Sequence, residues 1–357
     1  MKTTLRIVLA IAAKDITDAL KNKTILSVII GAAMLLLPGQ ALPWLARLNA
    51  KPSALIYDAG RSRWVAQLRR DETVAVQAVG STAELEAQLA GYSGALLGLS
   101  LPADLEQRLA AGQPVKLEGR LAHWVSAEDA EELRAVFERK LGEIAGRPVQ
   151  IALAEQRVYP AAESSGQTSL SAWALIIVML VIGGVLTPLL FLEERQMHTL
   201  EALLVSPATA GQVVAGKALA GLAYELATAV VGIVFFGYLV AQWGLAILAM
   251  ALAALLAVAL GLLLGTLSTG AQTLSPWFAL ALLPFFAPIF LQGRAGWEWV
   301  NWIPTALLAQ MLRASFAVSV EWPALLGAAG GVVGWMALFL GVVVWRVQRM
   351  MLTLGDL

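Results

Sequence analysis

The chain has 357 residues, of which 59% are hydrophobic, a share well above that of ordinary soluble domains. It contains no cysteine, which excludes disulfides and thiolate metal sites, and its formal net charge of zero gives no indication of a nucleic-acid partner. The charges are unevenly placed, because residues 47–165 carry 14 of the 25 Lys and Arg and 16 of the 25 Asp and Glu. This distribution predicts a membrane protein with one inserted water-soluble domain.

Residues 3–21 have the spacing of an amphipathic helix. Its apolar face is formed by Leu5, Leu9, Ala12, Ile16 and Ala19, and its charged face by Lys14, Asp18 and Lys21. We expect this helix to lie in the headgroup layer, with its lysines near anionic lipid. The alternative is a cleaved signal peptide whose apolar region begins at Ile25, but a basic lead of more than twenty residues is long for that role.

Six apolar windows are long enough to cross a membrane as helices, because about 20 helical residues span a hydrocarbon core of about 30 Å. The windows are residues 24–46, 168–192, 214–241, 244–267, 271–291 and 322–345. Pro276, Pro284 and Pro288 predict that the fifth of these helices is broken or irregular.

The segment between the last two windows has two features of its own. Trp297, Trp299 and Trp302 are clustered as in an interfacial aromatic belt. Residues 304–316 have the pattern of a short helix, which is either re-entrant or lies on the membrane surface.

Residues 47–166 have the pattern of a separate domain with alternating strands and helices. Strands are predicted at 54–58, 73–77, 95–99, 115–118 and 149–153, and helices at 81–90, 103–111 and 128–144. Ser81 and Glu84 form a capping-box start for the first helix. The third helix has a buried stripe formed by Ala130, Leu133, Phe137, Leu141 and Ile144. About 120 residues of this kind form a small α/β or α+β domain with a core of its own.

The lysines and arginines next to the spans predict the orientation. They are Lys2, Arg6, Lys14, Lys21 and Lys23 at one end of the chain and Arg346 and Arg349 at the other. Because positive residues collect on the cytoplasmic side, both termini are predicted to be cytoplasmic and the α/β domain extracytoplasmic.

The predicted fold is therefore an α-helical integral membrane protein. It has six transmembrane helices, an N-terminal interfacial helix and an inserted extracytoplasmic α/β (α+β) domain. The predicted domains are residues 1–46, with the interfacial helix and the first span, residues 47–166, and residues 167–357, which contain five spans.

A short charged segment, residues 193–217, connects the second and third spans on the predicted cytoplasmic side. Leu200, Leu203 and Leu204 lie on one side of a helical turn or two. Ser206 and Pro207 then provide an N-cap and a proline at the first helical position. A short rigid helix of this kind fits a groove in a partner; the alternative is a solvated connecting loop.

The same segment resembles the loop of type-2 ABC transporter permeases. The residues that carry the resemblance are Glu193, Glu194, Arg195, Thr199, Leu200, Glu201, Leu203, Leu204, Ser206, Pro207, Gly216 and Lys217. The order of the other elements is similar to the subgroup with a large extracytoplasmic domain between the first and second spans. The chain departs from the family at His198, where the family usually has glycine.

The resemblance implies the permease subunit of an ABC exporter in the cytoplasmic (inner) membrane. Separate ATP-binding subunits, which hold ATP and Mg, would dock on a coupling loop at residues 193–213. A second copy of the permease or a related permease would complete the pathway within membrane lipid. The chain itself is expected to have no catalytic residue, metal or cofactor, and it contains no Gly-x-x-x-x-Gly-Lys-Ser/Thr phosphate loop.

Two other classes of protein remain as alternatives. A membrane receptor or assembly factor would bind a ligand with the extracytoplasmic domain and signal without transport. A secondary transporter would require more charged residues at mid-membrane and inverted repeats, and neither is evident. Nothing in the spans selects a cargo.

Glu225 is the acidic residue that lies well inside a predicted span. An ionisable group in hydrocarbon is costly unless it faces protein, a partner or water. Glu225 is therefore either a residue of the transport pathway or a structural residue satisfied by Tyr224, Thr228 or a neighbouring helix.

The remaining candidates favour structural roles. Glu194 and His198 share a helix face, but a zinc-protease site requires a second histidine. His123 is expected to be a surface or core residue of the α/β domain. Gly183, Gly184, Gly330, Gly331 and Gly334 are expected to permit close helix packing rather than ligand binding.

Overall fold

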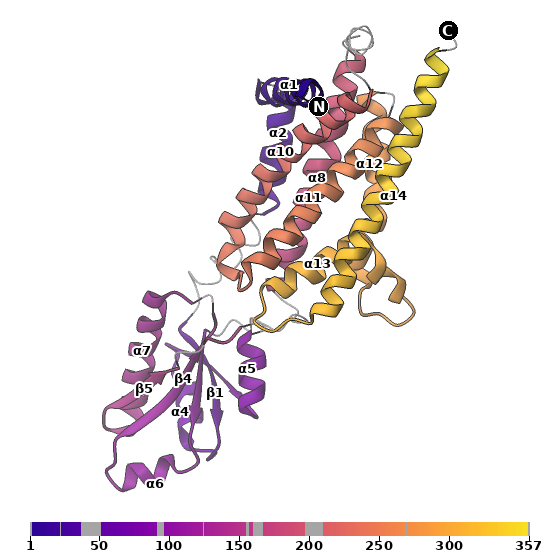
Figure 1. Cartoon of the computed structure of the whole chain (residues 1–357). Coiled ribbons are helices and arrows are strands. Elements are labelled where there is room, and N and C mark those ends of the chain that lie inside the picture. Colours follow the sequence, from indigo (N-terminus) through magenta and orange to yellow (C-terminus); the bar gives the residue numbers. More distant parts are fainter. Residues whose placement is uncertain are drawn as a thin grey trace.

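The computed structural model describes residues 2–21, 23–36, 51–90, 96–123, 125–154, 157–159, 167–196, 210–268 and 270–355. Long helices form a bundle that has an α/β domain beyond one end (Figure 1). The bundle contains α1 (Lys2–Lys21), α2 (Lys23–Met34), α8 (Gln167–Gln196), α10 (Ala210–Phe236), α11 (Trp243–Leu267), α12 (Ala271–Leu291), α13 (Pro304–Ser315) and α14 (Trp322–Gly355). Two 3-10 helices, η1 (Gly237–Leu239) and η2 (Glu298–Trp302), follow α10 and precede α13.

Among the described residues, five helices are long and apolar enough to span a membrane. These segments are Thr168–Leu190, Gly211–Leu239, Trp243–Leu267, Gln272–Leu291 and Trp322–Arg349. They match the last five predicted windows, which establishes a multi-pass membrane protein. The first window, residues 24–46, is described only as far as residue 36, with α2 as a 12-residue helix. The sixth span therefore stays a prediction.

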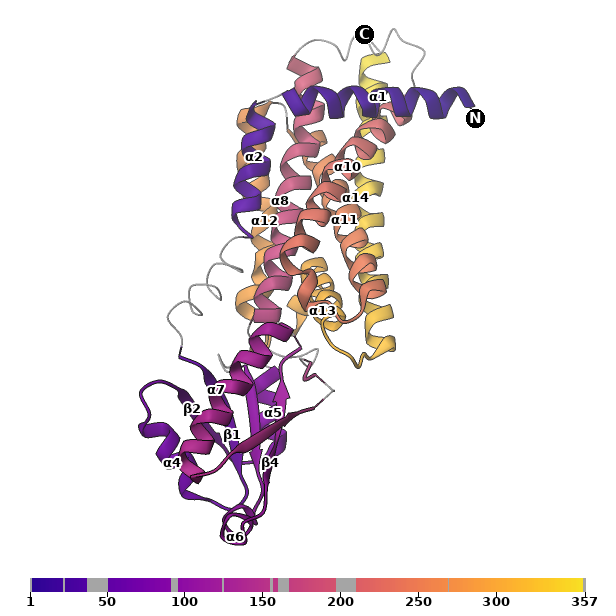
Figure 2. The same cartoon turned by 90° about the vertical axis from the view of Figure 1, so that its left-hand side faces the viewer.

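The centre of the bundle is formed by α8 and α11. In each of them 72% of the most apolar stretch is buried inside the chain, against 17% in α12, 22% in α14 and 33% in α10. The latter helices therefore present apolar side chains outward, as expected of helices that contact lipid or another subunit. α1 lies across one end of the bundle, opposite the α/β domain (Figure 2).

The prediction that α12 is broken was wrong. α12 is a continuous helix that contains Pro276, Pro284 and Pro288. Prolines are tolerated in membrane helices where neighbouring groups satisfy the backbone that they disturb. The Thr305 hydroxyl of α13 donates a 2.7 Å hydrogen bond to the Phe285 carbonyl, so α13 bonds to the backbone of the proline-containing stretch.

The helix predicted at 304–316 is α13, with Pro304 at its first position. It packs against α11, α14 and α8, and nearly all of its residues are buried. α13 is therefore packed among other helices of the chain, beside α14. Its depth in the membrane, either re-entrant or at the surface, stays a prediction.

The α/β domain contains a five-stranded mixed sheet. Its strands are β1 (Ser53–Asp58), β2 (Ala75–Val79), β3 (Leu97–Leu101), β4 (Val115–Leu121) and β5 (Val149–Leu153). The strand order is β2-β1-β3-β4-β5, and only the β3–β4 pair is antiparallel. Its helices are α4 (Arg63–Arg70), α5 (Thr82–Ala90), α6 (Leu105–Ala110) and α7 (Ala127–Ala145). α4 and α7 cover one face of the sheet and α5 the other (Figure 1).

The predicted elements of this domain are largely confirmed. β5 has the predicted bounds, whereas β2 and β3 begin two residues later than predicted. The capping interaction at α5 is present, because the Glu84 backbone N–H donates to Ser81 Oγ at 3.0 Å. α4 was missed, since its three buried residues, Trp64, Val65 and Leu68, stand among charged and polar neighbours.

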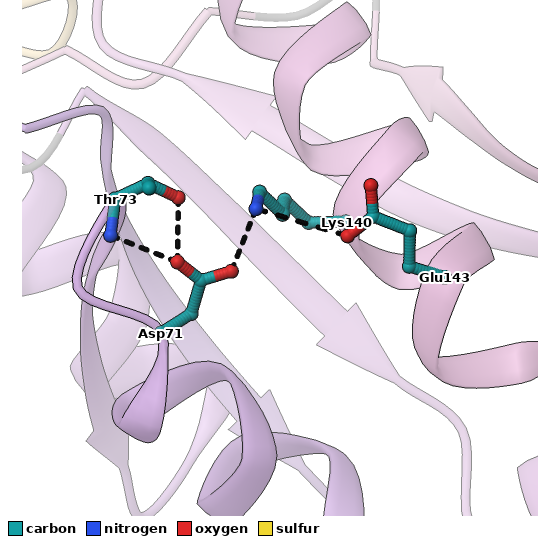
Figure 3. Close-up of polar contacts among 4 residues, drawn as sticks. All are labelled: Asp71, Thr73, Lys140 and Glu143. Carbon is teal, nitrogen blue, oxygen red and sulfur yellow. Dashed lines mark hydrogen bonds and ion pairs between the residues drawn. The ribbon is translucent and has the colours of Figure 1, made fainter.

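An ion-pair network joins the two helices on one face of the sheet (Figure 3). Asp71, which ends α4, accepts hydrogen bonds from the Thr73 N–H at 2.8 Å and the Thr73 hydroxyl at 2.5 Å. The Lys140 ammonium of α7 lies 2.8 Å from the other Asp71 oxygen and 3.7 Å from Glu143. The Lys140 and Thr73 donors hold the pKa of Asp71 well below its usual range, and Asp71 raises the pKa of Lys140.

Candidate functional site

The predicted coupling loop begins in the last turns of α8. Glu193, Glu194 and Arg195 belong to this helix, which continues to Gln196. The other predicted loop residues, Thr199, Leu200, Glu201, Leu203, Leu204, Ser206 and Pro207, lie outside the described residues, as does His198. The short helix expected at 199–205 therefore stays a prediction.

The two ends of this segment are positioned by α8 and α10. The end of α8 and the start of α10 lie at the end of the bundle crossed by α1, opposite the α/β domain (Figure 2). Three elements thus meet where the predicted loop leaves and re-enters the bundle. The side chains that hold these elements together are Lys217, Asp15 and Tyr224.

Lys217 is fully buried near the start of α10. Its ammonium donates a 2.7 Å hydrogen bond to the Leu190 carbonyl of α8 and lies 3.3 Å from Asp15 Oδ2 of α1. Asp15 is itself buried, with 6% of its surface exposed. An ammonium and a carboxylate removed from water each need a partner, and here each supplies the other.

Tyr224, two turns after Lys217, makes a second link to α1. Its hydroxyl donates to the Asp15 carbonyl at 3.1 Å, so α10 holds both the side chain and the backbone of Asp15. We call the group of Asp15, Leu190, Lys217 and Tyr224 the loop-base cluster. It joins α1, α8 and α10 into one unit at the root of the predicted coupling loop.

Gly216 permits this cluster to form. A Cβ atom at Gly216 would lie 2.7 Å from Ile11 Cγ2 and 3.3 Å from the Val8 carbonyl of α1. The glycine therefore lets α1 approach α10 closely enough for Asp15 to reach Lys217. The Gly-Lys pair in the sequence thus has a geometric reason within this chain.

Two members of the cluster were missed in the sequence. Asp15 falls at the edge of the predicted apolar face of the N-terminal helix, between Asp18 and Ala19 in angle. A charged residue next to an apolar face is the signal that would have identified it, because burial there requires a partner. The sequence suggests Tyr224 only as a partner of Glu225, its neighbour in the chain.

Glu225 does not bond to either residue proposed as its partner. The Tyr224 hydroxyl bonds to Asp15, and the Thr228 hydroxyl bonds to the Tyr224 carbonyl at 2.9 Å. Glu225 is fully buried and lies against the Gly183 backbone of α8. A Cβ atom at Gly183 would lie 2.7 Å from Oε1 of Glu225, and it would also meet Ala257 of α11. Neither carboxylate oxygen has a hydrogen-bond partner of good geometry among the described residues.

Thr187 provides a second buried polar group at the same helix contact. Its Oγ1 is also without a partner in the described chain, and a Cβ atom at Gly221 of α10 would lie 2.7 Å from it. Thr187 and Glu225 lie about one turn apart along the contact between α8 and α10. Glu225 thus faces packed helices, and its role in a transport pathway stays a prediction.

The expected close packing at glycines is confirmed at Gly183, Gly184 and Gly331. A Cβ atom at these positions would lie 2.6 Å from Ala257, Phe278 and Leu307, respectively. At Gly330 and Gly334 it would meet nothing within 4 Å in the described chain. Those two glycines of α14 therefore face outward.

The described part of the chain contains no group of three or more His, Asp or Glu side chains that could hold a metal ion. The loop-base cluster instead connects α1, α8 and α10 through one ion pair and two hydrogen bonds to backbone carbonyls.

Comparison with known protein families indicates the kind of protein in which the loop-base cluster acts. Residues 118–346 match the family model described as ABC-2 family transporter protein. The matched region includes the second half of β4, α7, β5 and the helices from α8 through most of α14. The comparison with curated proteins gives no match.

Proposed function

Because the chain belongs to the ABC-2 family of transporter proteins, we propose that it is the permease subunit of an ABC exporter driven by separate ATP-binding subunits. Family membership establishes a transport component that is not itself catalytic. The proposal adds the direction of transport, the docking of the ATPases on residues 193–213 and their supply of ATP and Mg. It also places the termini in the cytoplasm and residues 47–166 outside the cell membrane.

The observation that supports the proposal is the loop-base cluster. A coupling loop is useful only if a displacement of the loop reaches the membrane spans. Lys217 and Tyr224 bind α10 to α1, and Lys217 also binds the last turns of α8. A force on the loop would therefore act on three elements together, as required to pass nucleotide-driven closure to the bundle.

The outward-facing apolar surfaces of α10, α12 and α14 support a second permease subunit beside this one. Exporter pathways of this kind are completed between two permease halves, and we propose either a second copy or a related chain. The remaining apolar surface would contact lipid.

Affinity purification from native membranes tests the ATPase partner. The wild-type chain is expected to bring an ATP-hydrolysing subunit, and Glu194→Arg combined with Leu203→Arg is expected to lose it while the permease stays in the membrane. Glu106→Arg, on the exposed surface of α6, is the matched control and should retain the subunit. Purification of wild-type complexes free of ATPase would refute the proposal.

A further inference from the structure

A cleft of about 970 Å³ lies between the α/β domain and the adjacent ends of the membrane helices. The domain contributes α5, β4 and the segment after β5, including Arg120, Arg157 and Tyr159. The bundle contributes Gln242 from the α10–α11 turn and Val318 from the α13–α14 turn. The α10–α11 and α13–α14 turns lie at the end of the bundle away from α1 (Figure 1). The cleft that these turns line therefore lies beyond the helix ends at that side.

The bundle side of the cleft is a fixed surface. The Gln242 side-chain amide donates to the carbonyls of Ala317 at 3.1 Å and Val318 at 2.8 Å. The backbone N–H groups of Ala241 and Gln242 both donate to the Ser315 carbonyl, at 2.9 and 2.8 Å. These four bonds hold the two turns together, so the cleft has a preformed floor.

The domain side is tied to the bundle through His123. Its Nε2 donates to the Leu239 carbonyl at 3.2 Å, and its ring stacks on Tyr159 with centroids 4.6 Å apart. Burial, and to a smaller degree the charge of Arg157, lowers the pKa of His123. The stacked imidazole thus holds Tyr159 at the cleft wall.

The charges at the wall favour an anion. The described lining residues include two cations, Arg120 and Arg157, and one carboxylate, Glu86. Arg120 pairs with Glu86, so the positive charge of Arg157 is in excess. One Arg157 nitrogen donates to the Val125 carbonyl at 2.8 Å, and no described carboxylate pairs with it. A guanidinium carries five donors in a planar fork that matches phosphate, so Arg157 retains donors for a ligand.

The rest of the wall is apolar. One face of α5 presents Ala83, Ala87 and Ala90 to the cleft, and Val158 and Val318 complete it. A cleft with an apolar wall and a few convergent cationic donors is typical of small-molecule sites.

We propose that the cleft binds a molecule bearing a phosphate group, which Arg157 and Arg120 engage while its apolar part contacts the alanine face of α5. The phosphate is carried by a lipid headgroup or is free inorganic phosphate. The site does not depend on an ATPase partner, so it is tested on the permease alone and independently of the transport proposal.

The test is calorimetric titration of the full chain in phosphatidylcholine nanodiscs, with empty nanodiscs as background. The probes are dihexanoyl phosphatidic acid, dihexanoyl phosphatidylcholine and inorganic phosphate. Tighter binding of phosphatidic acid than of inorganic phosphate identifies a lipid source, and equal binding identifies a free anion. Arg157→Gln is expected to weaken the bound anionic probe about tenfold, the loss of one charged hydrogen bond, and Arg69→Gln, exposed on α4, to leave it unchanged.

Two further variants change the bundle side of the cleft and leave the α/β domain unaltered. They test the site even if Arg157→Gln disturbs the fold of the domain. Val318 is 63% exposed in the α13–α14 turn, so either charge fits there. Val318→Asp should weaken binding of the anionic probe and Val318→Lys should tighten it. The proposal fails if wild type binds neither anionic probe, or if the two Val318 variants bind with equal affinity.

Discussion

At the scale of single residues, the buried pair of Lys217 and Asp15 makes the sharpest prediction. Lys217→Met should destabilise the chain by about 3–5 kcal/mol, because Asp15 would be left buried and charged without its partner. Asp15→Leu combined with Lys217→Met removes both charges, and thermal unfolding in detergent should show its midpoint well above that of the single variant. A double variant as unstable as Lys217→Met would show that the pair contributes packing rather than charge.

Asp71 predicts a pH dependence in the α/β domain. Its folded pKa lies below the unfolded value near 3.8, so its stabilising contribution is fully present above that value and is lost as pH falls below it. Asp71→Asn should therefore increase hydrogen exchange in β2 and α7 at neutral pH, and the difference from wild type should shrink below about pH 4. The difference in exchange should be modest, because the Asp71–Lys140 ion pair is partly exposed to solvent, which screens its charges. A difference that is constant with pH would contradict this explanation.

The same scale shows where sequence reasoning stops. Lys217 was identified from a family motif, but its partner Asp15 lies 202 positions away, and no local pattern pairs them. Glu225 was recognised as unusual because burial of a carboxylate is costly wherever it occurs. What it contacts depends on Gly183 of another helix, which periodicity within α10 cannot indicate.

At the scale of elements, close contact between α8 and α11 requires Gly261. A Cβ atom there would lie 2.3 Å from the Gly183 carbonyl and 2.7 Å from Thr187 Cβ, and backbone cannot move aside as a side chain can. Gly261→Ala should therefore destabilise the bundle by about 1–3 kcal/mol or more, measured as a lower unfolding midpoint in detergent. Gly244→Ala, at the open start of the same helix, should be neutral or slightly stabilising. Equal midpoints for the two variants would show that the helices separate without cost.

Element prediction succeeded where one local signal was sufficient. Long apolar windows predicted the five described spans. Alternating apolar and polar residues predicted the strands, because burial of one face of a strand leaves a clear two-residue period. It failed where tertiary contacts override local rules. The prolines of α12 indicated a break, yet the helix continues through all three of them and is bonded to α13 by Thr305. The short α4 has too few buried residues to show a period.

At the scale of the whole molecule, α1 and the α/β domain lie at opposite ends of the bundle (Figure 2). Because the spans of the bundle cross the membrane, its two ends face different compartments. The chain has no cysteine, so single substitutions give unambiguous labelling sites. Glu106→Cys lies on the exposed surface of α6, and Asp18→Cys on the exposed face of α1.

In intact cells, an impermeant maleimide should label Glu106→Cys and leave Asp18→Cys unlabelled until the membrane is opened. This follows from the positive residues near both termini, which favour the cytoplasm. The coupling segment at the α1 end would then face the compartment that contains ATP. If Asp18→Cys alone is labelled in intact cells, the orientation is the reverse of the predicted one, the predicted ATPase-docking loop lies outside, and the exporter proposal is refuted. If both sites are labelled, the placement of the two ends in different compartments is refuted.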